Sequence, residues 1–424
     1  MPSSIIWQDD EKAITLIDVP TSIATAQGTS SSPCHCALKS CTPLQAPYPS
    51  IEPKSARAKA SITTSSASSA LHSNCVAILQ GALHTLRTGH DGLYCRPRTF
   101  VDSSPTKRKL SEIEFGCMTG TARNRPAVQA NAAPDDQSVA QEVSKSDVQL
   151  TCNAAGDVAF VNPTCDTVEG TLTGSSIKHL NGCRYRIPPR ASFFLGDCSN
   201  GSAFHAFFRS LNRPKFDFIL MDPPWPNASV RRTHKTAGST YGIMQTMQET
   251  QDLLAGLRLP LLMADDCLVG VWITNKEAVR ELVLGENGLF ETWGVTLVEE
   301  WLWLKVTTTG EPILPLDSAW RKPYEVLLLG RKGSAQPPGP PKRRVAVSVP
   351  DLHSRKPCLR SLIEPSMAKA GYGALEIFAR HLVAGWCSWG NECIKFNETS
   401  NWRKDDDART VVPTGHDTAH GSVA

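Results

Sequence analysis

The segment KFDFILMDPPW, residues 215–225, holds the most informative pattern in the chain. Its part FDFILM is a mostly apolar run with the length of a strand that is buried on both faces. Asp222 follows this run directly, and ligands of open α/β sheets bind beyond the carboxyl ends of the strands. Pro223 and Pro224 fix the backbone φ angle and lack an N–H, so the turn presents carbonyl acceptors. Trp225 adds a flat apolar face.

These groups suit a planar ring that carries an exocyclic amine. Asp222 and the carbonyl of Pro223 can each accept a hydrogen bond from the amine, while the ring stacks on an aromatic side chain. The amine of adenine is a weak nucleophile because its lone pair is delocalised into the ring. Two acceptors hold the nitrogen nearer to tetrahedral geometry and direct its lone pair at an electrophile. We therefore interpret residues 222–225 as a catalytic motif, against the alternative of a strand-ending turn with a packing tryptophan.

The residues around this motif, 151–397, alternate between apolar runs of strand length and segments of helix length. This alternation predicts an α/β domain whose sheet is buried on both faces. Strands are expected at 216–221, 267–273, 295–306, 324–330, 345–349 and 374–379, and helices near 245–263, 275–285 and 357–370.

The residues before this domain, 1–150, have a different composition. About one residue in three between 21 and 73 is Ser or Thr, which predicts disorder because such a segment buries too little apolar surface. A short ordered element is expected in 1–20, and the apolar spacing of 75–90 predicts one amphipathic helix. The polar residues 398–424 are predicted to form a disordered tail.

Composition and charge exclude several classes of protein. With 44 Lys and Arg against 41 Asp and Glu, the net charge of +3 excludes a protein that coats nucleic acid by charge alone. No apolar run is long enough to span a membrane. Acidic residues at 9–11 argue against a signal peptide, so the 14 cysteines are interpreted as thiols. No metal site is predicted, because Cys34-His35-Cys36 and Cys41 lack a second ligand pair. Lys107-Arg108-Lys109 predicts import into the nucleus, with the cytoplasm as the alternative.

The motif at 215–225 resembles that of the adenine-N6 methyltransferases related to the 70-kDa subunit of the messenger-RNA enzyme, the MT-A70 family. The resemblance covers about residues 180–396. Within the family, the sequence is most similar to the methyltransferase-like 4 branch. Further blocks agree in order and spacing: VWITN (271–275), EEWLWLKV (299–306), GEPILPLDS (310–318), KPYEVLLLGR (322–331), VSVPDLHSRKP (347–357), ALEIFAR (374–380) and GWCSWGNE (385–392).

The resemblance implies a Rossmann-like fold that uses S-adenosylmethionine, with the catalytic motif before the cofactor strand in a permuted order. The sequence has no GxGxxG after a strand, so a dinucleotide fingerprint is not supported. Two positions depart from the family pattern, which usually has His where this chain has Arg355 and Asn where it has His381. The positions that match cofactor-binding residues of the family are Asp197, Cys198, Lys356, Arg380, His381, Asn391 and Glu392.

Candidate substrate-binding residues form two groups. One group follows the motif, and the other lies at the end of a predicted strand. Arg231, Arg232, His234 and Lys235 form a basic stretch that is suited to contacts with phosphates. Tyr241 is suited to stacking on a base, and the resemblance places Trp303 and Lys305 beside the acceptor. The alternative for 227–244 is an ordinary solvated loop.

The sequence thus predicts a methyltransferase that acts on the N6 amine of adenine in RNA. The resemblance points to 2′-O-methyladenosine in small nuclear RNA. Two alternatives stay open at this point, namely a DNA adenine-N6 methyltransferase and a non-catalytic RNA-binding partner of an active paralogue. The resemblance leaves open both a monomer and a heterodimer with a paralogue.

Overall fold

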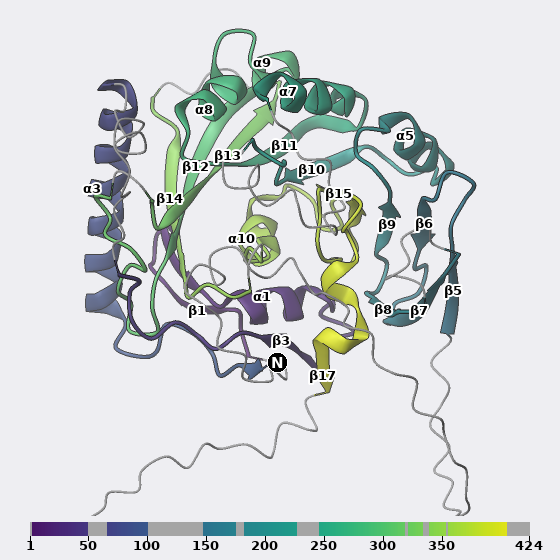
Figure 1. The fold of residues 1–424 in the computed structure, drawn as a ribbon, viewed down its shortest axis with the longest axis horizontal. Helices are drawn as coiled ribbons and strands as arrows, with labels where there is room; N and C mark the ends of the chain where they lie inside the picture. Colours follow the sequence, from purple (N-terminus) through teal and green to yellow (C-terminus); the bar gives the residue numbers. More distant parts are fainter. Residues whose placement is uncertain are drawn as a thin grey trace, which may run out of the picture.

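The computed structural model describes residues 2–49, 66–100, 147–174, 182–226, 246–318, 321–333, 339–352 and 355–404. Its centre is an eleven-stranded sheet in the order β1-β2-β14-β12-β13-β11-β10-β15-β16-β9-β6 (Figure 1). The strands are β1 Ile5–Gln8, β2 Ile14–Ile17, β6 Val158–Val161, β9 Ser192–Leu195, β10 Phe216–Met221, β11 Met263–Ile273, β12 Val295–Lys305, β13 Tyr324–Lys332, β14 Lys342–Ser348, β15 Ala374–Ile377 and β16 Cys387–Trp389.

Most strands of this sheet run in one direction. Strands β1, β13 and β6 are antiparallel to their neighbours, whereas β9, β16, β15, β10 and β11 form a continuous parallel block. Two small sheets flank it, made of β17 (Trp402–Lys404), β3 (Cys36–Ser40) and β4 (Thr99–Phe100), and of β5 (Asp147–Thr151), β7 (Val168–Thr173) and β8 (Arg184–Ile187). The mixed α/β fold expected from the sequence is therefore present.

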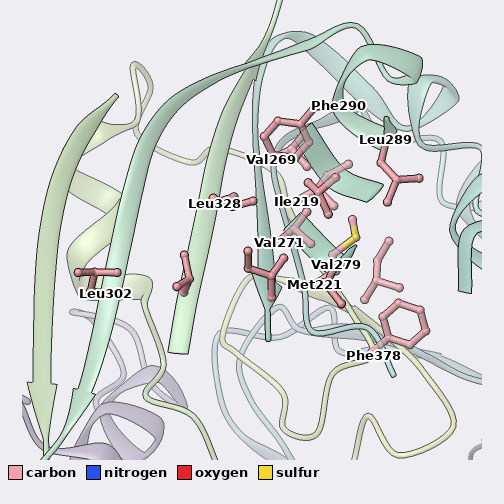
Figure 2. Packing of buried hydrophobic residues seen from close by; sticks show 14 of the residues in the cluster. Ile219, Met221, Val269, Val271, Val279, Leu289, Phe290, Leu302, Leu328 and Phe378 are labelled. Carbon is pink, nitrogen blue, oxygen red and sulfur yellow. The ribbon is translucent and has the colours of Figure 1, made fainter. Parts of the chain in front are cut away.

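Helices cover both faces of the central sheet. One face packs on α3 (Ser66–Gly89), α5 (Gly201–Ser210), α7 (Met247–Gly256), α8 (Glu277–Leu284) and α9 (Leu289–Thr292), and the other on α1 (Val19–Ala26) and α10 (Arg360–Ile363). Successive side chains of a strand point to opposite faces. Accordingly, Ile219 and Met221 of β10 join the first cluster, where Figure 2 shows them near Val279 of α8, and Phe218 and Leu220 join the second.

The strands predicted from the sequence are confirmed, with small shifts at their ends, and β10 has the predicted bounds. The helix predicted at 75–90 is also confirmed as the second part of α3, which begins earlier, at Ser66. Outside the described residues lie the predicted nuclear-import segment Lys107–Lys109 and the predicted substrate-binding residues Arg231, Arg232, Lys235 and Tyr241.

Two predictions of disorder are wrong for the residues that the structure describes. Within 21–73, α1 and β3 are ordered, and α1 begins with Asp18, whose side chain accepts a hydrogen bond from the backbone N–H of Thr21 at 3.0 Å. Strand β2 pairs in parallel with β14, so the N-terminal residues extend the central sheet. Within 398–404, β17 pairs with β3. The reason is tertiary pairing between distant segments, which composition does not reveal. No helix of the described ranges combines the length and apolarity needed to cross a membrane.

Helix α3 is an integral part of the core, and this can be tested. Leu86 is fully buried against the sheet. Leu86→Ala is expected to lower the free energy of unfolding by about 2–4 kcal/mol, because it removes apolar contacts and leaves a cavity. Chemical denaturation measures this, with the exposed Gln80→Ala on the same helix as the control. If both variants lower the free energy of unfolding by the same small amount, helix α3 is not packed as part of the core.

Candidate active site

The parallel block brings four strand ends to one edge of the sheet. Asp222 follows β10, Phe378 to Arg380 follow β15, and Asn391 with Glu392 follow β16. Asp197 comes shortly after β9, which is parallel to β16. Residues from separate sequence motifs therefore meet at the carboxyl edge of the sheet, where ligands of α/β sheets bind.

A cleft opens at this edge beside Asp222. Phe378, at its wall, has a backbone φ of 58°, a left-handed conformation that is unusual for a bulky residue. Such strained residues gather at ligand sites. The cleft is lined by Leu220, Asp222, Trp272, Arg355, Lys356, Pro357, Cys358, Leu359, Glu376, Phe378, Arg380, His381, Trp386 and Phe396.

A chain of alternating charges stands beside the catalytic motif. The ammonium of Lys356 lies 3.5 Å from the carboxylate of Asp222 and in close contact with Glu325. Glu325 also pairs with Lys305 at 2.5 Å. Burial opposes the charge of Lys356, but Asp222 and Glu325 outweigh it and raise the pKa of the lysine. Burial likewise opposes ionisation of Glu325, but the two lysines hold its pKa well below the usual value. Lys356 and Glu325 are thus both charged at neutral pH.

Aromatic rings support this charge chain. The rings of Trp272 and Trp303 meet edge to face at 5.9 Å, and Lys356 lies 4.9 Å from the first and 5.6 Å from the second. Trp225 donates a hydrogen bond from Nε1 to the carbonyl of Trp272 at 2.8 Å, which fixes the turn of the motif. Trp303 is only 3% exposed and donates to Ser348 Oγ at 2.7 Å. Trp303 therefore holds the lysines in place and offers no free face to a base.

The other predicted cofactor residues are placed as follows. Arg380 pairs with Glu392 at 3.2 Å, and Glu392 with Lys395 at 3.0 Å. Cys198 is buried in the core, and burial raises the pKa of its thiol. Asp197 is exposed and accepts a hydrogen bond from the N–H of Ser199 at 2.9 Å. The structure thus brings Arg380 and His381 to the cleft together with Lys356.

Two further acidic groups of the site were not singled out from the sequence. Glu325 belongs to the block KPYE and Glu376 to ALEIFAR, but both lie inside strands whose pattern otherwise indicates burial. A carboxylate within an apolar strand was the available signal. Glu376 lines the cleft, where burial and the neighbouring Asp222 raise its pKa to about 8, against the opposing effect of Arg380.

The groups of this cleft fit S-adenosylmethionine. Asp222, together with Glu376 when it is ionised, suits its sulfonium and ammonium charges, and two cations of the cleft, Arg355 and Lys356, suit its carboxylate. Arg380 lines the cleft and would supply donors for ribose hydroxyls, and it is held there by its ion pair with Glu392. His381 Nε2 is buried and has no hydrogen-bond partner among the described residues, as expected of a group that awaits a ligand.

The raised pKa of Glu376 predicts a pH-dependent affinity. Below about pH 8 this carboxyl is largely neutral, and above it the carboxylate attracts a cationic ligand. The affinity for S-adenosylmethionine is therefore expected to rise several-fold between pH 6.5 and 8, and Glu376→Gln should remove this rise. Titration calorimetry over this range measures it. A wild-type affinity that stays constant or falls would contradict the assignment.

Comparison with known proteins shows the family of this chain. Residues 216–392 match the model of the MT-A70 family. The N6-methyladenosine RNA methyltransferase MTA1 of Cryphonectria parasitica is 37% identical over 312 residues, which are 71% of this chain and 89% of that protein. The human N(6)-adenine-specific methyltransferase METTL4 is 37% identical over 333 residues, 75% of this chain and 64% of that protein.

A third relative carries a different substrate in its name. The DNA N6-methyl methyltransferase of Caenorhabditis elegans is 32% identical over 219 residues, 51% of this chain and 55% of that protein. The relatives differ in the nucleic acid and agree in the reaction. With its Asp-Pro-Pro-Trp turn at the head of a charged cleft, the chain belongs to the MT-A70 family of S-adenosylmethionine-dependent adenine-N6 methyltransferases.

Proposed function

We propose that this enzyme methylates the N6 amine of adenine in RNA, with 2′-O-methyladenosine of small nuclear RNA as the target. The observation that carries the reaction is Asp222 at the carboxyl end of β10, on a turn that is fixed by the hydrogen bond from Trp225 to Trp272. The RNA substrate is supported by the fungal relative, of which this chain covers 89% and which is named for N6-methyladenosine in RNA.

The residues of the cleft account for the transfer as follows. S-adenosylmethionine supplies an electrophilic methyl group on a sulfonium. Asp222 and the carbonyl of Pro223 accept the two hydrogen bonds of the adenine amine and direct the nitrogen lone pair in line with that methyl group. In this transfer an N–C bond would form as the C–S bond breaks, and the sulfur would keep the electron pair. The product ammonium then loses its proton to water or to Asp222.

Positioning and electrostatics provide the rate enhancement in this proposal. Lys356, between Asp222 and Glu325, pairs with the Asp222 carboxyl group and restricts its position. An adenine inside a duplex would have to leave the stack to reach Asp222, so an unpaired adenine is the less costly substrate.

A DNA substrate is the second candidate, because one relative is named for it. Transfer from labelled S-adenosylmethionine separates the candidates when four oligonucleotides of one sequence are compared: RNA with adenosine, RNA with 2′-O-methyladenosine, single-stranded DNA and double-stranded DNA. We expect product on the 2′-O-methylated RNA in excess over the others. Product on DNA alone would overturn the RNA assignment while retaining the chemistry.

A further inference from the structure

We propose that Arg355 binds the carboxylate of the cofactor through the Nε–Nη2 edge of its guanidinium. This inference rests on the use of S-adenosylmethionine by the family. It assigns the carboxylate to Arg355 in place of Lys356, the neighbouring cation of the cleft, and it gives a role to the residue at which this chain departs from the family pattern.

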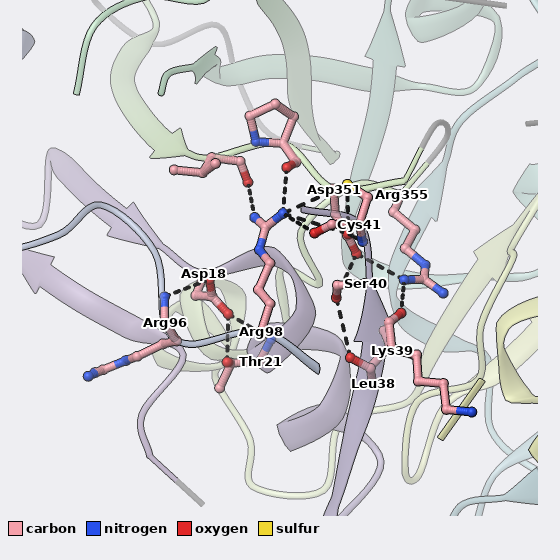
Figure 3. Close-up of polar contacts among 12 residues, drawn as sticks. Asp18, Thr21, Leu38, Lys39, Ser40, Cys41, Arg96, Arg98, Asp351 and Arg355 are labelled. Carbon is pink, nitrogen blue, oxygen red and sulfur yellow. Dashed lines mark hydrogen bonds and ion pairs between the residues drawn. The ribbon is translucent and has the colours of Figure 1, made fainter. Parts of the chain in front are cut away.

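The guanidinium of Arg355 is held rigidly at one end. Its Nη1 donates to the carbonyl of Lys39 at 2.6 Å and to Oδ2 of Asp351 at 2.9 Å (Figure 3). The plane lies 4.3 Å from the ring centre of Phe396. The side chain is fully buried, as is that of Asp351. These contacts leave the arginine one orientation.

The other edge of the guanidinium lacks a partner. Nε and Nη2 of Arg355 are buried and have no hydrogen-bond partner within the described part of the chain. Such unpaired buried donors cost about 1–3 kcal/mol or more each, so natural sites complete them with a ligand. The two N–H groups of this edge are parallel and match the two oxygens of a carboxylate. Arg355 lines the cleft, so a ligand that binds there can supply the partner.

The charges around the two candidate cations differ. Lys356 already faces two carboxylates, Asp222 and Glu325, so a third carboxylate there would meet repulsion. Asp351, which pairs with Arg355, is also 3.8 Å from the guanidinium of Arg98. Two arginines therefore share one carboxylate, which leaves an excess positive charge for an anionic ligand group.

The second departure from the family pattern faces the same cleft. Burial and the nearby charge of Arg355 lower the pKa of His381 to about 4, so its imidazole is neutral at physiological pH. A neutral ring does not compete with Arg355 for the carboxylate. Its unpartnered Nε2 is available to a polar atom of the same ligand.

The test is calorimetric and requires no turnover. Arg355→Met is titrated with S-adenosylhomocysteine and with the analogue that lacks only its carboxylate, 5′-deoxy-5′-(3-aminopropylthio)adenosine. We expect Arg355→Met to weaken the first ligand by about 30-fold, the range for charged hydrogen bonds, and the second by less than about threefold. The exposed Arg209→Met on α5 should change neither affinity.

Two outcomes would overturn the proposal. One is an equal loss for both ligands, and the other is a carboxylate-selective loss in Lys356→Met that Arg355→Met lacks. If Arg355→Met does not fold, Arg355→Lys tests the same point, because it keeps the charge and the stem but lacks the two-donor edge. The lysine variant is expected to show the same selective loss, and wild-type affinity for both ligands would refute the proposal.

Discussion

Asp222→Asn is expected to lower the rate of methyl transfer by about 10³-fold or more, the scale for loss of a positioned electrostatic contact at the reacting atom. The amide has nearly the same shape, but it lacks the negative charge and presents a donor in place of one acceptor. The adenine amine would then lose one of the two acceptors that orient its lone pair. Single-turnover transfer to the best substrate measures the rate, and calorimetry with S-adenosylhomocysteine measures cofactor affinity.

The affinity for S-adenosylhomocysteine should change much less than the rate, by about tenfold at most, because Lys356 and the rest of the cleft stay in place. Asp217→Asn is the matched control, since it removes a carboxylate from the same strand. Asp217 accepts hydrogen bonds from Lys369 at 2.8 Å and from the N–H of Gly373 at 2.9 Å, before the start of β15. The Asp217→Asn variant should transfer the methyl group at the wild-type rate. An Asp222→Asn variant within tenfold of wild type would refute the assigned role.

The bounds of β10 could be predicted from the sequence because both signals are local. An apolar run determines the strand, and the two prolines after Asp222 end it. The order of α1 could not be predicted, because it depends on a distant segment. Ser22 is one of the residues whose type suggested disorder, yet it is buried and accepts a hydrogen bond from the N–H of Cys358 at 2.9 Å. Composition gives no signal for a partner 336 residues away.

The candidate site likewise has residues that local sequence motifs predict and residues that only tertiary contacts show. Asp222 could be predicted from the chemistry of the Asp-Pro-Pro-Trp turn after an apolar strand, and Lys356 and Arg380 from motifs that the resemblance identifies. Glu325 was not found, because its role depends on partners from other segments. Lys305 comes from the neighbouring strand β12, and Lys356 follows β14. Only the assembled sheet edge shows that one carboxylate serves two lysines.

Glu325→Gln is expected to lower the transfer rate by about 10²-fold and the free energy of unfolding by about 2 kcal/mol. The change leaves the ammonium groups of Lys305 and Lys356 without their shared counter-charge. Loss of one partner of a fully buried ion pair costs about 3–5 kcal/mol. The Glu325 side chain is 29% exposed, so solvent screening reduces this cost. Lys356 would also draw closer to Asp222 and pull it from the acceptor position. Single-turnover kinetics and chemical denaturation measure the two effects.

The stability part of this prediction has a defined pH dependence. The pKa of Glu325 is held below its usual value near 4.5, so its ion pairs stabilise the fold above that pH. The stabilisation is lost as the pH falls below 4.5 through the folded-state pKa of Glu325. The difference in the free energy of unfolding between wild type and Glu325→Gln should therefore narrow in this range. The double variant Lys305→Met with Glu325→Gln removes one stranded ammonium and should recover part of the stability, with no recovery of the rate. If the difference in the free energy of unfolding widens in acid instead, Glu325 is protonated at neutral pH. The site would then lack the charge chain that holds Lys356 beside Asp222.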